Sequence, residues 1–136
     1  KVLEYRNGRP KFHGDNDLYA ATVAISLLEH GIADNVNLVL LSGKKNGILD
    51  ETGKTIPTIN IRDIESMIAK SSEKNDSSRE GSNGFTTKGA ALIMSYKAGV
   101  QTYIGSAISS TTAITEAAGK TQPTTVTKIT ENLSQI

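Results

Sequence analysis

The chain has 136 residues, of which 37% are hydrophobic and 21% charged, as is typical of one modest globular domain with a single core. Its net charge of +1, its aromatic content of 4% and its lack of tryptophan disfavour binding to nucleic acid or to a membrane surface. There is no cysteine, and no apolar run approaches the roughly 18 residues of a membrane span. We therefore expect a soluble cytoplasmic protein without disulfides or thiolate metal sites.

The first third of the chain predicts a hairpin, a helix and a strand. Residues 1–12 have the pattern of an extended or hairpin segment, with Asn7-Gly8 as the turn signal. Between Leu18 and Glu29, apolar residues cover most of a helix surface, and Gly31 is a typical helix end. Residues 37–42, NLVLLS, form a continuous apolar run, which predicts a central strand buried on both faces.

The rest of the chain alternates between strands and helices. After a turn-rich connection, the patterns predict a strand at 58–61, a helix at 62–72 with Ile64, Met67 and Ile68 facing inward, a helix at 86–99, a strand at 100–105, a short helix at 111–118 and a strand at 124–129. Residues 71–84 offer almost nothing to bury and predict a mobile loop. The alternation indicates an α/β domain, layered and with a largely parallel sheet.

The first candidate site is Gly14-Asp15-Asn16-Asp17, directly ahead of the first helix. One short polar side chain is enough to cap a helix, so a simple N-cap is the structural alternative. Three polar side chains exceed that need. In open α/β sheets, ligands bind where strands end and helices begin, and carboxylate and amide groups there suit an ammonium group or the orientation of cationic catalytic groups.

The second candidate site is GSNGFTTKGAA, residues 81–91, in which glycines and small hydroxyl side chains lead into a helix. Free amides at a helix N-terminus, together with the ammonium of Lys88 in its first turn, would suit a phosphate. A flexible linker followed by a surface lysine explains the same pattern. Neither this stretch nor residues 47–55 has the spacing of a Walker P-loop.

Other polar residues carry weaker signals. His13 and His30 are separated by a whole helix, and we interpret both as ordinary histidines, so no metal ligand is predicted. Ser42 is a candidate ligand contact because it ends the apolar strand. Lys44 and Lys45 are close enough in sequence to approach a phosphate, although lysines in a turn are commonly only solvated.

Three stretches in this order resemble the amino acid kinase family: HGDNDLYAATVA, NLVLLSGKKNGIL and GSNGFTTKGAALIMSYKAGVQTYIG. The Gly-Asp-Asn-Asp motif opening a helix is typical of that family, and the chain is most similar to the C-terminal, nucleotide-binding half of glutamate 5-kinases. The resemblance implies a layered α/β/α fold. It also implies transfer of the γ-phosphoryl group of ATP to the side-chain carboxylate of glutamate or a similar amino acid, which opens proline biosynthesis.

The resemblance also implies roles for individual residues. Asp15 and Asn16 would contact the amino acid, and Asp17 would position the catalytic lysines. Lys88 would neutralise the charge that develops on the transferred phosphoryl group. ATP would bring Mg²⁺, bound through its phosphates. The residues implied to contact the nucleotide are Ser42, Gly43, Gly81, Ser82, Asn83, Gly84, Phe85, Thr86, Thr87 and Lys88.

Several positions depart from the family pattern. Gly43 stands where the family usually has an aspartate at the nucleotide, Ser82-Asn83 replaces Thr-Gly, and Phe85 replaces a methionine. These differences are compatible with a changed substrate or a lost activity. The alternatives to a glutamate 5-kinase are therefore another enzyme of the superfamily with a different acceptor, and a non-catalytic ligand-binding or regulatory module.

The resemblance covers only about half of the family's kinase domain. The glycine-rich loop with a further phosphate-binding lysine and the Asn-Glu-Asn-Asp substrate segment are not found in these residues. We therefore expect residues 1–136 to be a single partial domain that is inactive alone, with the missing N-terminal half as its partner. An apolar strand edge would favour association with that half or formation of a homo-oligomer.

Overall fold

The structure, a computed structural model, describes residues 3–6, 9–12, 16–43, 45–73, 84–119 and 124–131. Its elements in chain order are β1 (Leu3–Arg6), β2 (Arg9–Phe12), α1 (Asn16–Glu29), β3 (Asn37–Leu41), β4 (Thr58–Asn60), α2 (Ile61–Glu73), α3 (Gly84–Lys97), β5 (Gln101–Gly105), α4 (Ser110–Ala117) and β6 (Val126–Thr130). None of the helices described is long and apolar enough to cross a membrane.

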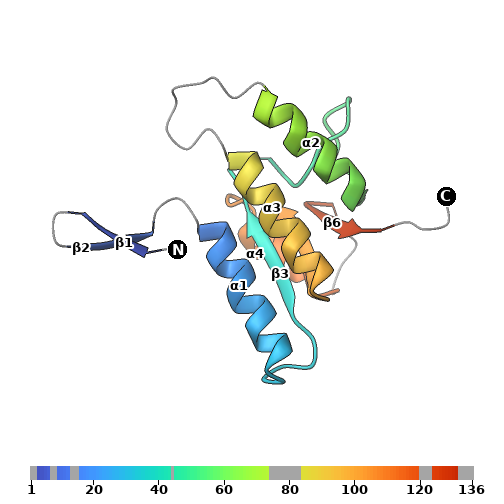
Figure 1. Ribbon diagram of the computed structural model, residues 1–136. Helices are drawn as coiled ribbons and strands as arrows, with labels where there is room; N and C mark the ends of the chain where they lie inside the picture. The colour runs from blue at the N-terminus through green and yellow to red at the C-terminus, as the bar shows by residue number, and fades with distance from the viewer. Residues whose placement is uncertain are drawn as a thin grey trace.

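The hairpin expected at the start of the chain is present. Strands β1 and β2 pair antiparallel, with Arg6 opposite Arg9, so that the two residues Asn7 and Gly8 connect them. The hairpin lies apart from the rest of the structure (Figure 1). It forms its own two-stranded sheet rather than an extension of the main sheet.

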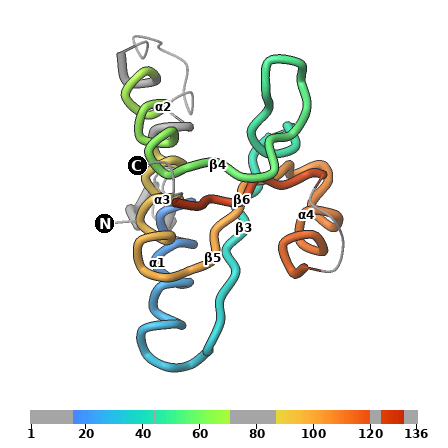
Figure 2. The backbone as a smooth tube through the Cα atoms, turned by 90° about the vertical axis from the view of Figure 1, so that its right-hand side faces the viewer, coloured from blue at the N-terminus to red at the C-terminus, as the bar shows by residue number. Residues whose placement is uncertain are grey.

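The main sheet has four strands in the order β3-β5-β6-β4. The β3–β5 and β4–β6 pairs are parallel and the β5–β6 pair is antiparallel, so the sheet is mixed and mostly parallel. Helices α1, α2 and α3 cover one face, and α4 covers the other (Figure 2). These layers confirm the predicted α/β fold.

Strand β3 is not central among the strands that the structure describes. Its one neighbour there is β5, and its burial alternates along the strand. The apolar run at residues 37–42 is explained by burial on both faces of β3 and not by a central position in the sheet. Leu38 and Leu40 pack into the core beneath the three helices, while Val39 and Leu41 pack on the side of α4. Both faces of β3 are covered, but one of its edges has no neighbour among the described strands, so the predicted central position was wrong for the sheet that the structure describes.

The main core lies between the sheet and helices α1, α2 and α3. Ile64 of α2, Leu92 of α3 and Ile129 of β6 are fully buried there. Met67 and Ile68 pack against the same core, which confirms the inward face predicted for α2. Such an apolar stripe stabilises a helix chiefly through its tertiary contacts.

The loop predicted at residues 71–84 includes residues that the structure places in helices. Helix α2 continues through Glu73 and α3 begins at Gly84, so both ends of the predicted loop belong to helices. Polar residues are compatible with a helix end, because the last turn of a helix needs little burial. Residues 74–83, on which the predicted mobility rested, lie outside the described residues.

Candidate functional site

The N-termini of α1 and α3 lie at the same edge of the sheet. Each helix precedes a strand of the parallel β3–β5 pair and runs back along it, so its first turn lies near the carboxyl end of that strand (Figure 1). This is the edge where open α/β sheets bind ligands. The strand that precedes α1 belongs to the separate hairpin, so the expected strand-to-helix junction at Asp15-Asn16-Asp17 is not a junction of the main sheet.

An ion pair joins the two helix N-termini. The ammonium Nζ of Lys88 donates to the carboxylate Oδ2 of Asp17 at 2.7 Å. The two side chains are only 13% and 25% exposed, so the pair is largely shielded from water. In this setting a charge-assisted hydrogen bond is stronger than it would be at the surface. The carboxylate thus fixes the position of the ammonium.

The residues around Asp17 are only partly described. Asp15 lies outside the described residues, and Asn16 is the exposed first residue of α1. Asp17 stands inside the first turn, where a carboxylate also interacts favourably with the helix dipole. Its side chain is paired with Lys88, so Asp17 does more than an N-cap would require.

The stretch before Lys88 is more helical than its composition predicts. Helix α3 begins at Gly84, so Gly84, Phe85, Thr86 and Thr87 form its first turn and Lys88 follows one turn inside. A first turn tolerates glycine and threonine because its amides have no intrahelical acceptors. The expectation that Lys88 lies in the first turn was therefore wrong. Gly81, Ser82 and Asn83 lie outside the described residues.

A pocket of about 440 Å³ opens at the carboxyl ends of β3 and β5. Ser42 and Gly43, which follow β3, line it together with Ile104 of β5. Met67 reaches it from α2, and the 45–49 turn supplies the rest of its lining. Its walls are mostly apolar, and its volume lies in the range of about 300–1,000 Å³ that is common for small-molecule sites.

Hydrogen bonds to the next loop hold the backbone at Gly43. Its carbonyl accepts from the hydroxyl of the buried Ser106 at 3.2 Å and from the amide of Ala107 at 3.1 Å. Gly43 has a φ of 53°, and a Cβ there would meet no atom within 4 Å. The position therefore has room for a side chain, although its backbone conformation favours glycine.

The 45–49 turn is anchored at Gly47, whose φ is 78°. The hydroxyl of the buried Thr127 on β6 accepts from the amide of Ile48 at 2.9 Å and donates to the carbonyl of Ile56 at 2.6 Å. A Cβ on Gly47 would lie 2.6 Å from that hydroxyl oxygen. Only glycine permits this close approach, which brings the turn against the sheet and forms one wall of the pocket.

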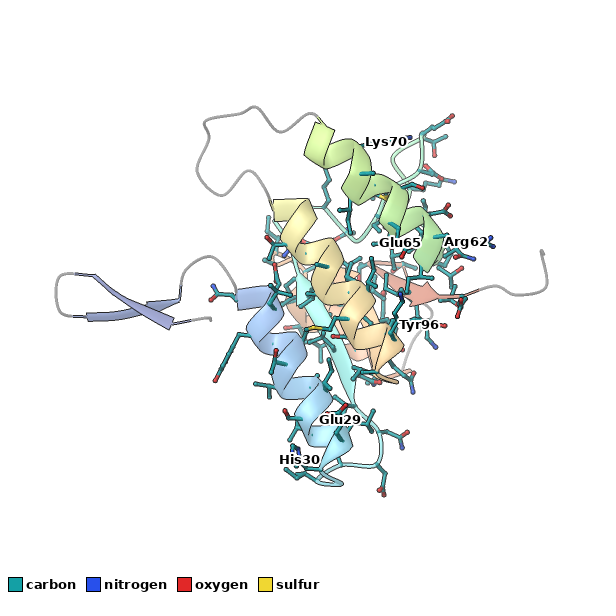
Figure 3. All side chains as sticks on the ribbon, viewed as in Figure 1. Glu29, His30, Arg62, Glu65, Lys70 and Tyr96 are labelled. Carbon is teal, nitrogen blue, oxygen red and sulfur yellow. The ribbon has the colours of Figure 1, made fainter. Side chains whose placement is uncertain are left out.

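The histidine described by the structure is remote from this edge. His30 lies at the other end of α1 from Asp17 (Figure 3), and its Nδ1 contacts the carbonyl of Ser26 at 2.9 Å. His13 lies outside the described residues. In the part of the chain that the structure describes, no three His, Asp or Glu side chains gather into a group that could hold a metal ion.

Of the residues that line the pocket, only Ser42 and Gly43 were assigned to a site from the sequence, and Met67 and Lys45 are among those that were not. Met67 was expected only to face the core, yet it also lines the pocket. Lys45 was left as either a phosphate contact or a solvated lysine, and it too lines the pocket. The signal for Lys45 was its place three residues after Ser42, but only the fold of the turn brings it to the pocket.

Comparison with known proteins finds a partial similarity to one enzyme. The chain is 37% identical over 91 residues to glutamate 5-kinase of Kosmotoga olearia. The similarity is to a kinase. It covers 67% of this chain but only 22% of that enzyme. No family model matches the chain. The match therefore supports a relationship to kinases, without deciding a particular activity.

Proposed function

We propose that this chain contributes the nucleotide-binding part of an enzyme that transfers the γ-phosphoryl group of ATP to the side-chain carboxylate of glutamate. The proposal depends above all on the 2.7 Å ion pair between Lys88 and Asp17. Because of this pair, the ammonium of Lys88 is held in position near the edge of the sheet at which the pocket opens. The partial identity to a glutamate 5-kinase supports the choice of glutamate as acceptor.

In the proposed reaction, a carboxylate oxygen of glutamate attacks the γ-phosphorus of ATP. The bond from that phosphorus to the bridging oxygen breaks, and ADP leaves with the electron pair. Negative charge is spread over the transferred group, and an ammonium close to it lowers the barrier. Lys88 would supply this charge, and Asp17 would hold Lys88 in position without taking part in proton transfer.

The nucleotide would occupy the pocket beside Ser42 and Gly43. The apolar side chains of Ile48, Leu49 and Ile104 suit the flat surface of a base. The first turn of α3, from Gly84 to Thr87, would present free backbone amides to the phosphates, with Gly81, Ser82 and Asn83 preceding it in the chain. Mg²⁺ would enter with the nucleotide through its phosphates and neutralise part of their charge.

The amino-acid substrate would bind beside the start of α1. Asn16 is exposed there, one residue before the paired Asp17. Its amide can accept from an ammonium group and donate to a carboxylate. Asp15, next to it in the sequence, would add a negative charge that suits the ammonium of an amino acid. This assignment makes Asp15 and Asn16 binding residues and leaves the chemistry to Lys88.

We further propose that the remaining phosphate and substrate contacts come from a segment outside these 136 residues, equivalent to the N-terminal half of such a kinase. The matched region is less than a quarter of the relative's length, which supports this view. The open edge of β3 among the described strands is a suitable place for such a segment to pair. A second copy of the chain is the alternative occupant.

The test is an assay of ATP-dependent phosphorylation of glutamate by the full-length protein. Lys88→Ala is expected to lower kcat by at least about a hundredfold, because it removes a charge placed at the reacting group. Lys97→Ala is the matched control, since Lys97 is an exposed lysine in the last turn of the same helix. Equal activity of the Lys88 variant and the wild-type protein would contradict the catalytic assignment.

Two other outcomes correspond to the alternative functions. Transfer to a different carboxylate or phosphate acceptor would indicate another enzyme of the superfamily. Binding of ATP without transfer to any acceptor would favour a regulatory module. Gly43, which has no side chain to contact a nucleotide, is the feature most compatible with that second possibility.

A further inference from the structure

Lys45 differs from the other residues at the pocket. Among the described residues that line the pocket, it is the only one with a charged side chain. The others are Ser42, two glycines and four apolar residues, none of which attracts an anion. A ligand with both an apolar body and negative charge would therefore find its complementary charge in Lys45.

The backbone beneath Lys45 is held in place. The amide of Gly47 donates to the carbonyl of Lys45 at 2.9 Å, which closes the turn. The hydroxyl of Thr55 donates to the carbonyl of the next residue, Asn46, at 2.7 Å. A Cβ at Gly47 would lie only 2.6 Å from the hydroxyl oxygen of Thr127, so this position strongly favours glycine. The Cα of Lys45 therefore has a fixed position, while its side chain remains exposed.

The side chains of Lys88 and Lys45 differ in their ion pairing. Lys88 is paired with Asp17, so their charges largely cancel at a distance. No described residue forms an ion pair with Lys45. Its charge is thus free to interact with a ligand, and an exposed ammonium binds a phosphate through a charge-assisted hydrogen bond at little cost in desolvation.

We infer that Lys45 binds the phosphate chain of the nucleotide in this pocket and makes the pocket selective for nucleoside phosphates over nucleosides. The inference rests on the proposed function, because it takes the ligand of the pocket to be ATP. It gives Lys45 a role in binding specificity rather than in the chemical step, which is assigned to Lys88.

The experiment compares ATP and adenosine as ligands of the full-length protein by isothermal titration calorimetry. Lys45→Gln is expected to weaken ATP binding about tenfold, as for one lost hydrogen bond to a charged group. Adenosine binding should change less than twofold. The affinity for ATP should also fall less steeply with added salt in the variant than in the wild type.

Matched variants separate this role from a structural one. Lys54→Gln removes an exposed lysine from the same connection without touching the pocket, and it should bind ATP as the wild type does. Lys45→Arg should retain most of the affinity because it keeps the charge. Circular dichroism checks that each variant is folded.

The outcomes are distinguishable. If Lys45→Gln binds ATP like the wild type, or loses ATP and adenosine equally, Lys45 does not recognise phosphates and the inference is wrong. The proposed function would survive either result. If the wild-type protein binds neither ligand, the proposed function fails and this inference fails with it.

Discussion

Asp17 and Lys88 are 71 positions apart in the chain, yet their charged groups meet at 2.7 Å. The contact joins the start of α1 to the start of α3, and the two helices pack against each other along their length (Figure 1). The pair therefore has a structural role as well as its proposed catalytic one, and the two roles are measured separately.

Breaking the pair from one side should cost more stability than removing both charges. Asp17→Asn leaves the mostly buried ammonium of Lys88 without its carboxylate, and we expect the free energy of unfolding to fall by about 1–2 kcal/mol. The double variant with Lys88→Met should recover part of this loss, because the uncompensated charge is gone. Urea denaturation of the four proteins of this cycle measures the coupling. A double variant less stable than either single variant would contradict it.

Gly47 is expected to be the most sensitive glycine of the pocket. Gly47→Ala combines a positive φ with a contact of 2.6 Å to Thr127, and we expect a loss of about 3 kcal/mol in stability. Gly53→Ala is the control, since Gly53 has a φ of 89° but open space around it, and it should lose only about 1 kcal/mol. Thermal and urea unfolding compare the two. Similar losses in both variants would mean that the close approach to Thr127 is unimportant.

Glu116 links α4 to the start of β6. Its carboxylate accepts four hydrogen bonds of 2.7–2.9 Å, from the amides and hydroxyls of Thr124 and Thr125. Burial alone raises the pKa of Glu116, but the four hydrogen bonds together lower it below the ordinary value. The carboxylate form therefore stabilises the fold above the unfolded pKa of about 4.3, and this contribution is lost as the pH falls through the lower folded pKa.

Glu116→Gln tests this link. The amide replaces one acceptor oxygen by a donor, so the variant should lose about 2 kcal/mol of stability at pH 7. The difference from the wild type should shrink as the solution is acidified below the unfolded pKa. Glu65→Gln, on the exposed face of α2 (Figure 3), is the control and should change little. A constant difference between Glu116→Gln and the wild type at pH 7 and pH 2 would refute the linkage.

The edge of β3 leads to a prediction about association. Because this apolar strand has one neighbour among the described strands, we expect the 136-residue chain to self-associate or to bind a complementary segment. Sedimentation equilibrium across a range of concentrations tests this expectation. A folded protein that stays monomeric at high concentration would count against both forms of association.

Much of the local structure was predictable from the chain alone. The apolar period of 62–72 predicted α2 and its inward face, and Asn7-Gly8 predicted the two-residue turn of the hairpin. Both depend on residues a few positions apart, which a sequence pattern records directly. The helix predicted from residue 86 begins two residues earlier, at Gly84, because glycine is a poor helix former that a first turn nevertheless tolerates.

The candidate site was predictable in its parts but not in its assembly. The Gly-Asp-Asn-Asp motif drew attention to Asp17, and the glycine-rich stretch 81–91 drew attention to Lys88. Their contact followed from the resemblance to a kinase family, because no local pattern brings together residues 71 positions apart. Lys45 was left open between a phosphate contact and a solvated lysine, and only the fold of the turn placed it at the pocket.

The sequence by itself determined that the chain alternates strands and helices, since apolar periodicity acts over one or two turns of backbone. Only the tertiary structure decided that β3 lies at an edge of the described sheet, that β6 runs antiparallel to β5 and parallel to β4, and that two helix N-termini share an ion pair. Strand order and long-range pairs depend on how preformed elements bury their apolar faces against each other. The packing of the whole domain determines strand order and long-range pairs, and a short stretch of sequence therefore does not predict them.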